Sequence, residues 1–219
     1  MRLDLDRLAR PFVVLSERYY PDPFVFAIAL TAAAFALAIG VTSTSPLEAL
    51  AIWGGGLTGL LAFTTQVGLT LVCAHALAHT DVVRRAIERV AARPATPPQA
   101  YALVALLAGG ASLLAGALGL VVGALSALAV AEQGRRRGLR LHFPLLVASA
   151  YSGFLIWHMG YSGSIPLLVA TPGHMLESSM GLVPITQTTF SAANLALAGV
   201  TLAATAFLCS RLEPTASAI

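Results

Sequence analysis

The sequence predicts an all-helical integral membrane protein that contains a re-entrant helical hairpin and a discontinuous transmembrane helix. Of its 219 residues 57% are hydrophobic and 11% charged, and the mean hydropathy of +0.80 lies beyond the usual range of soluble domains. Residues 101–131 are apolar throughout, but their number suits neither one crossing nor two. Residues 158–173 concentrate glycine, serine and proline inside a stretch that is long enough to cross.

Residues 1–22 are predicted to form a cytoplasmic segment at the membrane surface. Residues 2–20 alternate charges with apolar positions, which is typical of a short surface helix, and Pro21-Asp22-Pro23 ends it. The first apolar run begins only after these mixed residues, so we expect no cleavable signal. The membrane domain is expected over residues 23–211, and its first crossing over about 24–41.

The second crossing is predicted at about 50–80, inside the apolar stretch from Leu47 to Thr80. Gly54-Gly55-Gly56 is a candidate break, so one straight helix and a kinked one are both open. From Asp81 to Arg93 the arginines lie opposite valines and Ile87, which predicts an amphipathic helix at the membrane interface.

Residues 101–131 predict a hairpin that turns at its glycines and leaves the membrane on the side of entry. Two crossings need about 40 residues and a turn, whereas one straight helix of 31 residues is about ten too long. A turn at membrane depth is stable only where protein or a watery cavity meets the freed backbone groups.

The remaining crossings are predicted at about 143–172, broken in its middle, and at 190–210, followed by a cytoplasmic tail at 212–219. All 13 basic residues are arginines, and with a re-entrant hairpin every one of them falls on the side of the N-terminus. The positive-inside rule therefore places the N-terminus in the cytoplasm of a multi-pass protein. Because the arginines form short clusters between apolar runs, the net charge of +3 does not indicate nucleic acid binding.

The broken segment is the best candidate for a binding site. A helix interrupted within the membrane presents backbone N–H groups and a positive dipole end to an anion, while its freed carbonyls can hold Na⁺. Serine and threonine hydroxyls can bond a carboxylate without burial of a charge. A surface loop or a tightly packed crossing is the alternative. The hairpin glycines likewise suit either a binding tip or close helix packing.

The candidate binding residues are Gly116, Gly119, Gly160, Tyr161, Ser162, Gly163, Ser164, Thr171 and Pro172. His158 and His174 flank the break and are candidates for proton coupling, although local hydrogen bonding would also explain them. No Asp, Glu, Lys or Arg lies at the predicted membrane depth, so a buried carboxylate relay is not expected, and either Na⁺ or H⁺ remains open as coupling ion.

An enzyme is not expected. The sequence has no Ser-His-Asp ordering, nucleotide loop or cysteine cluster, and no cofactor or bound metal is predicted. His75 and His79 share one helix face, as metal ligands would, but Ala76 stands where a zinc-protease motif needs glutamate. We therefore interpret this pair as packing or interfacial residues, and an intramembrane metalloenzyme ranks third among the functional hypotheses.

Six segments resemble the short-chain fatty acid transporter family, in the same order along the chain. They are Tyr20–Ala27, Leu60–Phe63, His75–Ala78, Gly119–Ala124, Ser162–Leu168 and Ala170–Gly173. The resemblance implies a multi-pass protein of the bacterial inner membrane that moves short-chain carboxylates such as acetoacetate or butyrate. It also implies one repeat of an inverted-repeat fold of the ion-transporter superfamily, in which each repeat has a re-entrant hairpin and a discontinuous helix.

The chain departs from this family at points that bear on substrate and coupling ion. The family is rich in glycine where this chain has His158-Met159, often has Asn in place of His174, and has Asn-Trp near Ala115-Gly116. The chain resembles only the N-terminal half of members about twice as long. A separately encoded C-terminal half or an oligomer is therefore the expected partner. The alternative is a truncated or assembly protein that does not transport.

Overall fold

The computed structural model describes residues 11–12, 14–15, 18, 22–42 and 44–212, and all regular structure in these ranges is helical, which confirms the predicted class. The surface helix predicted over residues 2–20 and the tail predicted at 212–219 fall largely outside the described residues. Six helical segments in these ranges are long and apolar enough to cross a membrane, as expected of a multi-pass protein. The chain forms two compact units, residues 1–69 and 70–219.

The first unit holds α2 (Pro23–Val41) and most of α3 (Pro46–Ala78). The Asp22 side chain caps α2, and Pro23 occupies its first turn, where a missing N–H costs no helical hydrogen bond. No residue of α2 is buried within the chain, although its mean hydropathy is 2.5. An apolar surface on every side is what lipid contact requires of a spanning helix.

Gly54-Gly55-Gly56, the candidate break, does not interrupt the helix, because α3 runs through all three glycines. In water each glycine would cost a helix about 1 kcal/mol relative to alanine. In hydrocarbon the cost is outweighed, since an interrupted helix would leave N–H and C=O groups without partners. The apolar stretch therefore forms one long helix.

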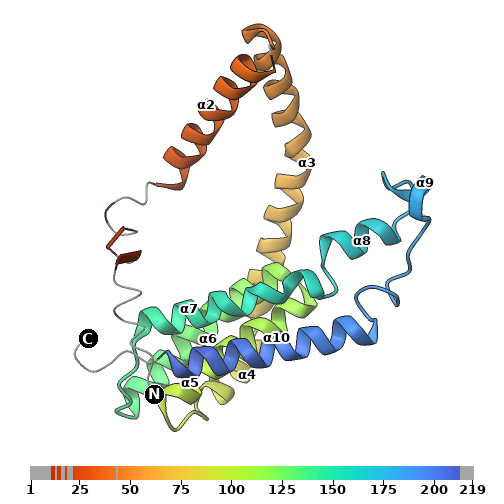
Figure 1. Ribbon diagram of the computed structural model, residues 1–219. Helices are drawn as coiled ribbons and strands as arrows, with labels where there is room; N and C mark the ends of the chain where they lie inside the picture. Colours follow the sequence, from red (N-terminus) through yellow and green to blue (C-terminus); the bar gives the residue numbers. More distant parts are fainter. Residues whose placement is uncertain (1–10, 13, 16–17, 19–21, 43, 213–219) are drawn as a thin grey trace. The chain divides into compact units, whose positions relative to one another are not determined.

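The second unit packs α5 (Pro97–Leu114), α6 (Gly116–Arg136), α7 (Phe143–Gly153) and α10 (Ala192–Arg211) side by side (Figure 1). Its core consists largely of small side chains. Gly153 of α7 shows how closely the helices approach, because a Cβ there would lie 2.6 Å from the Gly109 backbone nitrogen of α5. Helix association in membranes depends on such contacts, since lipid supplies no hydrophobic driving force between helices.

Helix α4 (Asp81–Ala91) is amphipathic as predicted, but part of its apolar face is covered by protein. Ile87 and Ala91 are buried, and α4 packs against α6. Val82, at its start, remains exposed. The helix is thus a packed element of the unit, which its sequence period alone could not distinguish from a helix lying on lipid.

Helices α5 and α6 form the predicted hairpin, but the length argument for re-entrance was wrong. The arms extend to Pro97 and Arg136, giving 18 and 21 residues, or about 27 and 32 Å, each close to the thickness of a hydrocarbon core. The start of α5 and the end of α6 lie at the same end of the unit, where Arg137 bonds the Ala92 carbonyl and the His142 N–H bonds the Tyr101 hydroxyl. The two arginine clusters that flank the hairpin therefore lie at one end of the unit, whatever the depth of the turn.

Candidate functional site

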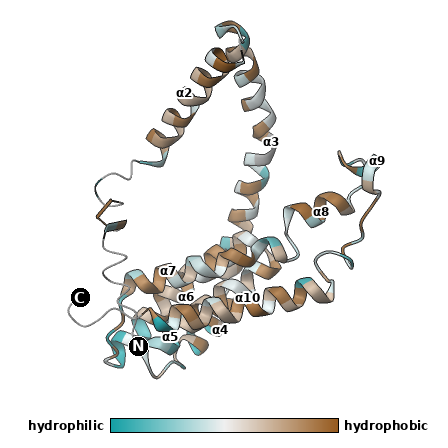
Figure 2. Cartoon of the chain, in the orientation of Figure 1, coloured by the Kyte–Doolittle hydropathy of each residue, from teal (hydrophilic) through white to brown (hydrophobic). Residues whose placement is uncertain are grey.

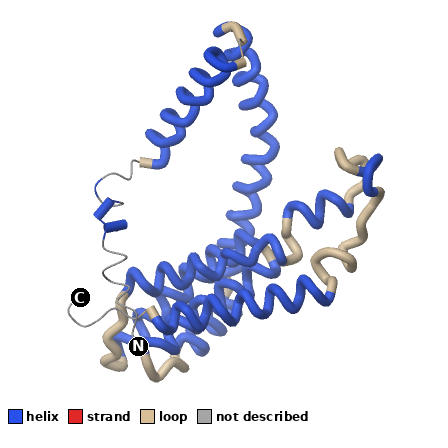
Figure 3. The backbone as a smooth tube through the Cα atoms, viewed as in Figure 1, coloured by secondary structure: helices blue, strands red, loops and turns tan. Residues whose placement is uncertain are grey.

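The discontinuous helix consists of α7, the 3-10 helix η1 (Phe154–Met159), an irregular loop at 160–163 and the short α8 (Ser164–Ala170) (Figure 3). Glycines make this loop compact. A Cβ on Gly163 would overlap the carbonyl oxygen of His158, so a larger residue has no room there. Pro166 lies in the first turn of α8, where its ring is tolerated. The interruption therefore follows from residues within the segment itself.

The hairpin turn is a single residue. Ala115 is extended, with φ −154° and ψ 132°, and α6 begins at Gly116. A Cβ on Gly116 would lie 2.8 Å from the ring of Trp157 in η1, so glycine permits the turn to seat against the 3-10 helix. The tip of the hairpin thus meets the middle of the discontinuous helix.

Two hydrogen bonds join the tip to the break. The Tyr161 N–H donates to the Leu113 carbonyl at 2.8 Å, and the Gly116 N–H donates to the Ser162 Oγ at 3.0 Å. Gly160 packs directly on Leu113, because a Cβ there would lie 2.5 Å from the Leu113 Cα. The structure therefore brings together Gly116, Gly160, Tyr161, Ser162 and Gly163.

This junction has the chemistry of an anion site. Ser162 caps the first turn of α6 as an acceptor, so its own O–H stays available as a donor. Helix geometry leaves the N–H groups of Ala117 and Leu118 without partners inside α6, and the helix dipole places positive charge there. Residues 94–131 and 141–176 contain no Asp, Glu, Lys or Arg, so no carboxylate of these segments repels an anion and no cation competes for it.

Four candidate residues lie apart from this junction. Gly119 faces Ser112 of α5, where a Cβ would lie 2.8 Å from the Ser112 Cα, so it serves helix packing. Ser164 is exposed at the start of α8, and Thr171 follows its end, about 10 Å further along the helix axis. The Thr171 hydroxyl donates to the Leu167 carbonyl at 2.7 Å, and Pro172 is exposed beyond it.

The two histidines beside the break differ in environment. His158 is exposed, and its ring centroid lies 3.7 Å from that of Trp157. His174 is buried in the loop after α8, where its Nδ1 accepts from the Leu176 N–H at 3.2 Å. Its Nε2 must then carry the proton and donates to the Gly181 carbonyl, also at 3.2 Å. Local hydrogen bonding thus occupies both ring nitrogens of His174.

His75 and His79 contact each other, with ring centroids 4.0 Å apart. The Nδ1 of His79 lies 2.9 Å from the His75 carbonyl oxygen, within hydrogen-bonding distance. No group of three or more metal-ligating side chains occurs among the described residues.

The sequence comparisons identify the family. The model of the short chain fatty acid transporter family matches residues 4–219. The chain belongs to the short-chain fatty acid transporter family. Two relatives carry the name "Putative short-chain fatty acid transporter". The one from Escherichia coli (strain K12) is 37% identical over 213 residues, and the one from Haemophilus influenzae (strain ATCC 51907 / DSM 11121 / KW20 / Rd) is 35% identical over 198.

The alignments cover 97% and 87% of this chain but 48% and 43% of those relatives, so this member of the family spans about half the length of the curated relatives it matches. No solved structure gives a significant match to it. The family match includes both the hairpin tip and the interrupted helix.

Asn194 was not among the candidate residues predicted from the sequence of this transporter-family chain, although its side chain contacts the discontinuous helix. Its Nδ2 donates to the Met159 carbonyl at 2.9 Å and to the Thr189 carbonyl at 2.8 Å. Asn194 thereby fastens the end of η1 to the segment that precedes α10. The available signal was an amide side chain three residues after Ser191, at the start of an otherwise apolar crossing.

We expect Asn194→Ala to lower the thermal unfolding temperature of the detergent-solubilised protein by several degrees. The change leaves two partly buried carbonyls without their donor, which costs about 1–3 kcal/mol. Asn194→Asp should be worse, since carboxylate oxygens would face those carbonyls. The exposed amide of Gln187 provides a matched control, and Gln187→Ala should unfold like the unchanged protein. Equal unfolding of the Asn194 and Gln187 variants would contradict this role.

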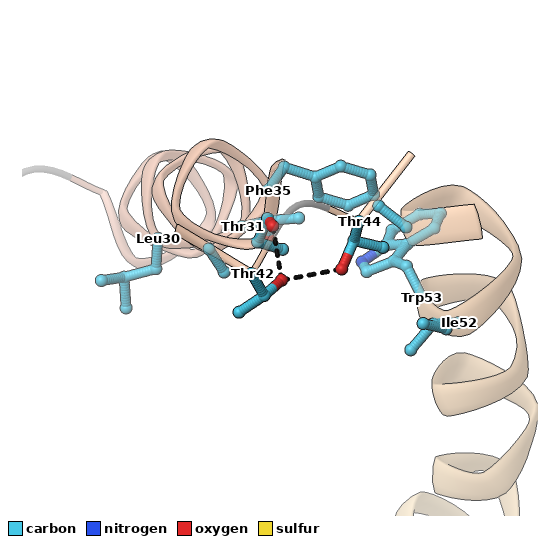
Figure 4. A pocket seen from close by; sticks show the side chains of 10 residues that line it. Leu30, Thr31, Phe35, Thr42, Thr44, Ile52 and Trp53 are labelled. Atoms are coloured by element: carbon cyan, nitrogen blue, oxygen red, sulfur yellow. Dashed lines mark hydrogen bonds between the residues drawn. The ribbon is translucent and has the colours of Figure 1, made fainter. Parts of the chain in front are cut away.

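A groove of about 570 Å³ lies between α2 and α3 in the first unit (Figure 4). It is lined mostly by apolar side chains, among them Leu30, Phe35 and Trp53. The hydroxyl of Thr31 donates to the Ala27 carbonyl, and that of Thr42 bonds the Ala38 carbonyl and Thr44. Because these hydroxyls are already engaged and no lining residue is charged, the groove offers an anion fewer hydrogen-bond donors than the N-terminus of α6 does.

Proposed function

We propose that the chain forms the substrate-binding half of a secondary transporter for short-chain fatty acids and related carboxylates. The observation that carries the proposal is the hydrogen bond from the Gly116 N–H to the Ser162 Oγ. This bond places the Ser162 hydroxyl, which can still donate its own proton, beside the positive N-terminal end of α6, in a region without charged side chains. A small carboxylate needs donors of this kind, and its short apolar tail fits a membrane-embedded surface.

We place the carboxylate at the N-terminal turn of α6, bonded by the Ser162 O–H and the N–H groups of Ala117 and Leu118. Gly116, Gly160, Tyr161 and Gly163 shape this site. Ser164, Thr171 and Pro172 would then contact substrate only on its way along α8. Family membership favours this function over a non-transporting membrane protein and over a metalloenzyme.

Coupling is proposed to use Na⁺ or H⁺. If protons drive uptake, His158 is the better placed carrier, because its ring is exposed beside the break whereas both ring nitrogens of His174 are engaged. Uptake driven by an imposed Na⁺ gradient at constant pH would assign Na⁺. Uptake that follows only a pH gradient would assign H⁺.

Uptake of labelled butyrate and acetoacetate tests the function. The chain is expressed alone and together with the part of the relatives that it does not cover, after membrane insertion is confirmed in both cases. The family match runs along this chain itself and gives no support to a separately encoded C-terminal half. Uptake is nevertheless measured both without and with the remaining part of the relatives, because this chain spans about half of their length. Uptake above that of cells without the protein, in either case, supports the proposal. Its absence in both would refute transport of these substrates.

We also propose that the hairpin is re-entrant within one of two inverted repeats, in a bacterial inner membrane with the N-terminus in the cytoplasm. The 13 arginines and the shared end of α5 and α6 support a cytoplasmic N-terminus and a hairpin that returns to its side of entry. The resemblance to the family motivates the re-entrant depth and the inverted repeats. A cysteine at Ala115 should then react with a water-soluble thiol reagent, and substrate should slow that reaction. A cysteine at exposed Leu106, half-way along α5, should react far more slowly. A tip as unreactive as this control would exclude a watery cavity there.

A further inference from the structure

A strongly basic surface covers one end of the second unit, where α5 begins, α6 ends and α7 begins. Residues 81–93 and 132–142 carry eight arginines and three carboxylates. Figure 2 shows hydrophilic residues gathered at this end, around α4 and the connection from α6 to α7, while the long helices are largely hydrophobic.

The three carboxylates are engaged by other arginines. Asp81 and Glu88 both pair with Arg84, at 3.4 and 4.0 Å. Glu132 pairs with Arg135 and Arg136, each at 2.9 Å. Among the described residues of these two segments, five arginines pair with no carboxylate. Arg85 and Arg137 donate to backbone carbonyls instead. The other three, Arg89, Arg93 and Arg140, are exposed, so they carry the positive charge that is most available to a ligand.

Two hydrogen bonds bring Arg93 and Arg140 into neighbouring segments. Arg137 donates from Nη1 to the carbonyl of Ala92, at the end of α4. Five residues later, the His142 N–H donates to the Tyr101 hydroxyl in the first turns of α5, at 2.9 Å. The segment 137–142 is thus tied at both ends to the segment 92–101. Arg89 lies one helical turn before Arg93.

We propose that this surface, Arg89 with Arg93 and Arg140, binds the phosphate headgroup of an anionic phospholipid. Arginine presents a planar fork that matches phosphate oxygens, and these three have no carboxylate partner that would compete. The surface lies where apolar helices end, which is the level of the headgroups in a bilayer. The N-terminus of α5 adds the positive end of its dipole, since Thr96 gives it no side-chain cap.

The test compares two triple variants of equal charge change, both measured as the complete protein. One is Arg89→Gln, Arg93→Gln and Arg140→Gln. The control is Arg84→Gln, Arg135→Gln and Arg136→Gln, which removes paired arginines instead. The control is stringent because it also frees carboxylates that repel anionic lipid. Binding is measured by reconstitution into phosphatidylcholine vesicles with and without phosphatidylglycerol, and by the anionic lipid that remains on the protein after detergent extraction.

The unchanged protein should retain phosphatidylglycerol in preference to phosphatidylcholine. This preference should fall at least fivefold in the first variant and less than twofold in the control, with both proteins inserted in the membrane. Equal losses would show that only total charge matters, and the absence of any preference in the unchanged protein would overturn the proposal. Inorganic phosphate is added in a separate arm. Competition by millimolar phosphate as effective as that by the lipid would identify a site for free phosphate instead.

Discussion

Gly160→Ala is expected to reduce uptake by at least tenfold and to lower the thermal stability of the protein. The backbone at Gly160 has φ −90° and ψ −177°, which any residue can adopt, so no conformational strain is involved. The effect is steric. An added Cβ would lie 2.5 Å from the Leu113 Cα and 2.7 Å from its carbonyl carbon. These are backbone atoms of the hairpin, and they cannot move aside as a flexible side chain would.

The hairpin tip must therefore separate from the break, and the bonds from Tyr161 to Leu113 and from Gly116 to Ser162 are lost with it. Overpacking of this kind costs about 1–3 kcal/mol, and more where backbone opposes backbone. Uptake and thermal unfolding in detergent measure the two effects. Gly110→Ala is the matched control, since that glycine of α5 faces open space and alanine favours a helix. Similar behaviour of the two variants would contradict the proposed contact.

Ser162→Ala is expected to raise the substrate concentration for half-maximal uptake by at least tenfold. The hydroxyl has two roles, as the acceptor for the Gly116 N–H and as the proposed donor to the carboxylate. Loss of a helix cap costs about 1 kcal/mol, and loss of a hydrogen bond to a charged group costs about 1.5–3 kcal/mol. The second term acts on substrate affinity, and 1.4 kcal/mol corresponds to a factor of ten.

Ser164→Ala provides the control for Ser162→Ala, because it removes the same group two residues later. Ser164 is exposed at the start of α8. The sequence alone predicted equal roles for both serines, whereas the structure joins only Ser162 to the hairpin. Concentration-dependent uptake by membrane-inserted variants distinguishes them. Ser162→Thr keeps a hydroxyl and should restore part of the affinity. Equal effects of the two alanine changes would place the carboxylate along α8 instead.

Composition and local pattern determined much of this protein. The apolar runs specify helices long enough for a membrane, because unpaired backbone groups are not tolerated in hydrocarbon. The interruption at 160–163 depends on Gly160, Gly163 and Pro166 within the segment itself. The hairpin was predicted from the length of the apolar stretch 101–131 and from the glycines near its middle. Its arms are longer than that stretch suggested.

Only the tertiary structure decided which residues meet. Gly116 and Gly119 could not be distinguished by sequence, but Gly116 packs against Trp157 at the hairpin tip whereas Gly119 packs against Ser112 of α5. The pairing of Gly116 with Ser162 spans 46 residues, and that of Asn194 with Met159 spans 35. Helix periodicity assigns a residue to a face of its own helix, whereas contacts between helices depend on how those faces are matched in space. The membrane helices could therefore be predicted from the sequence, whereas the candidate site depends on how those helices pack against one another.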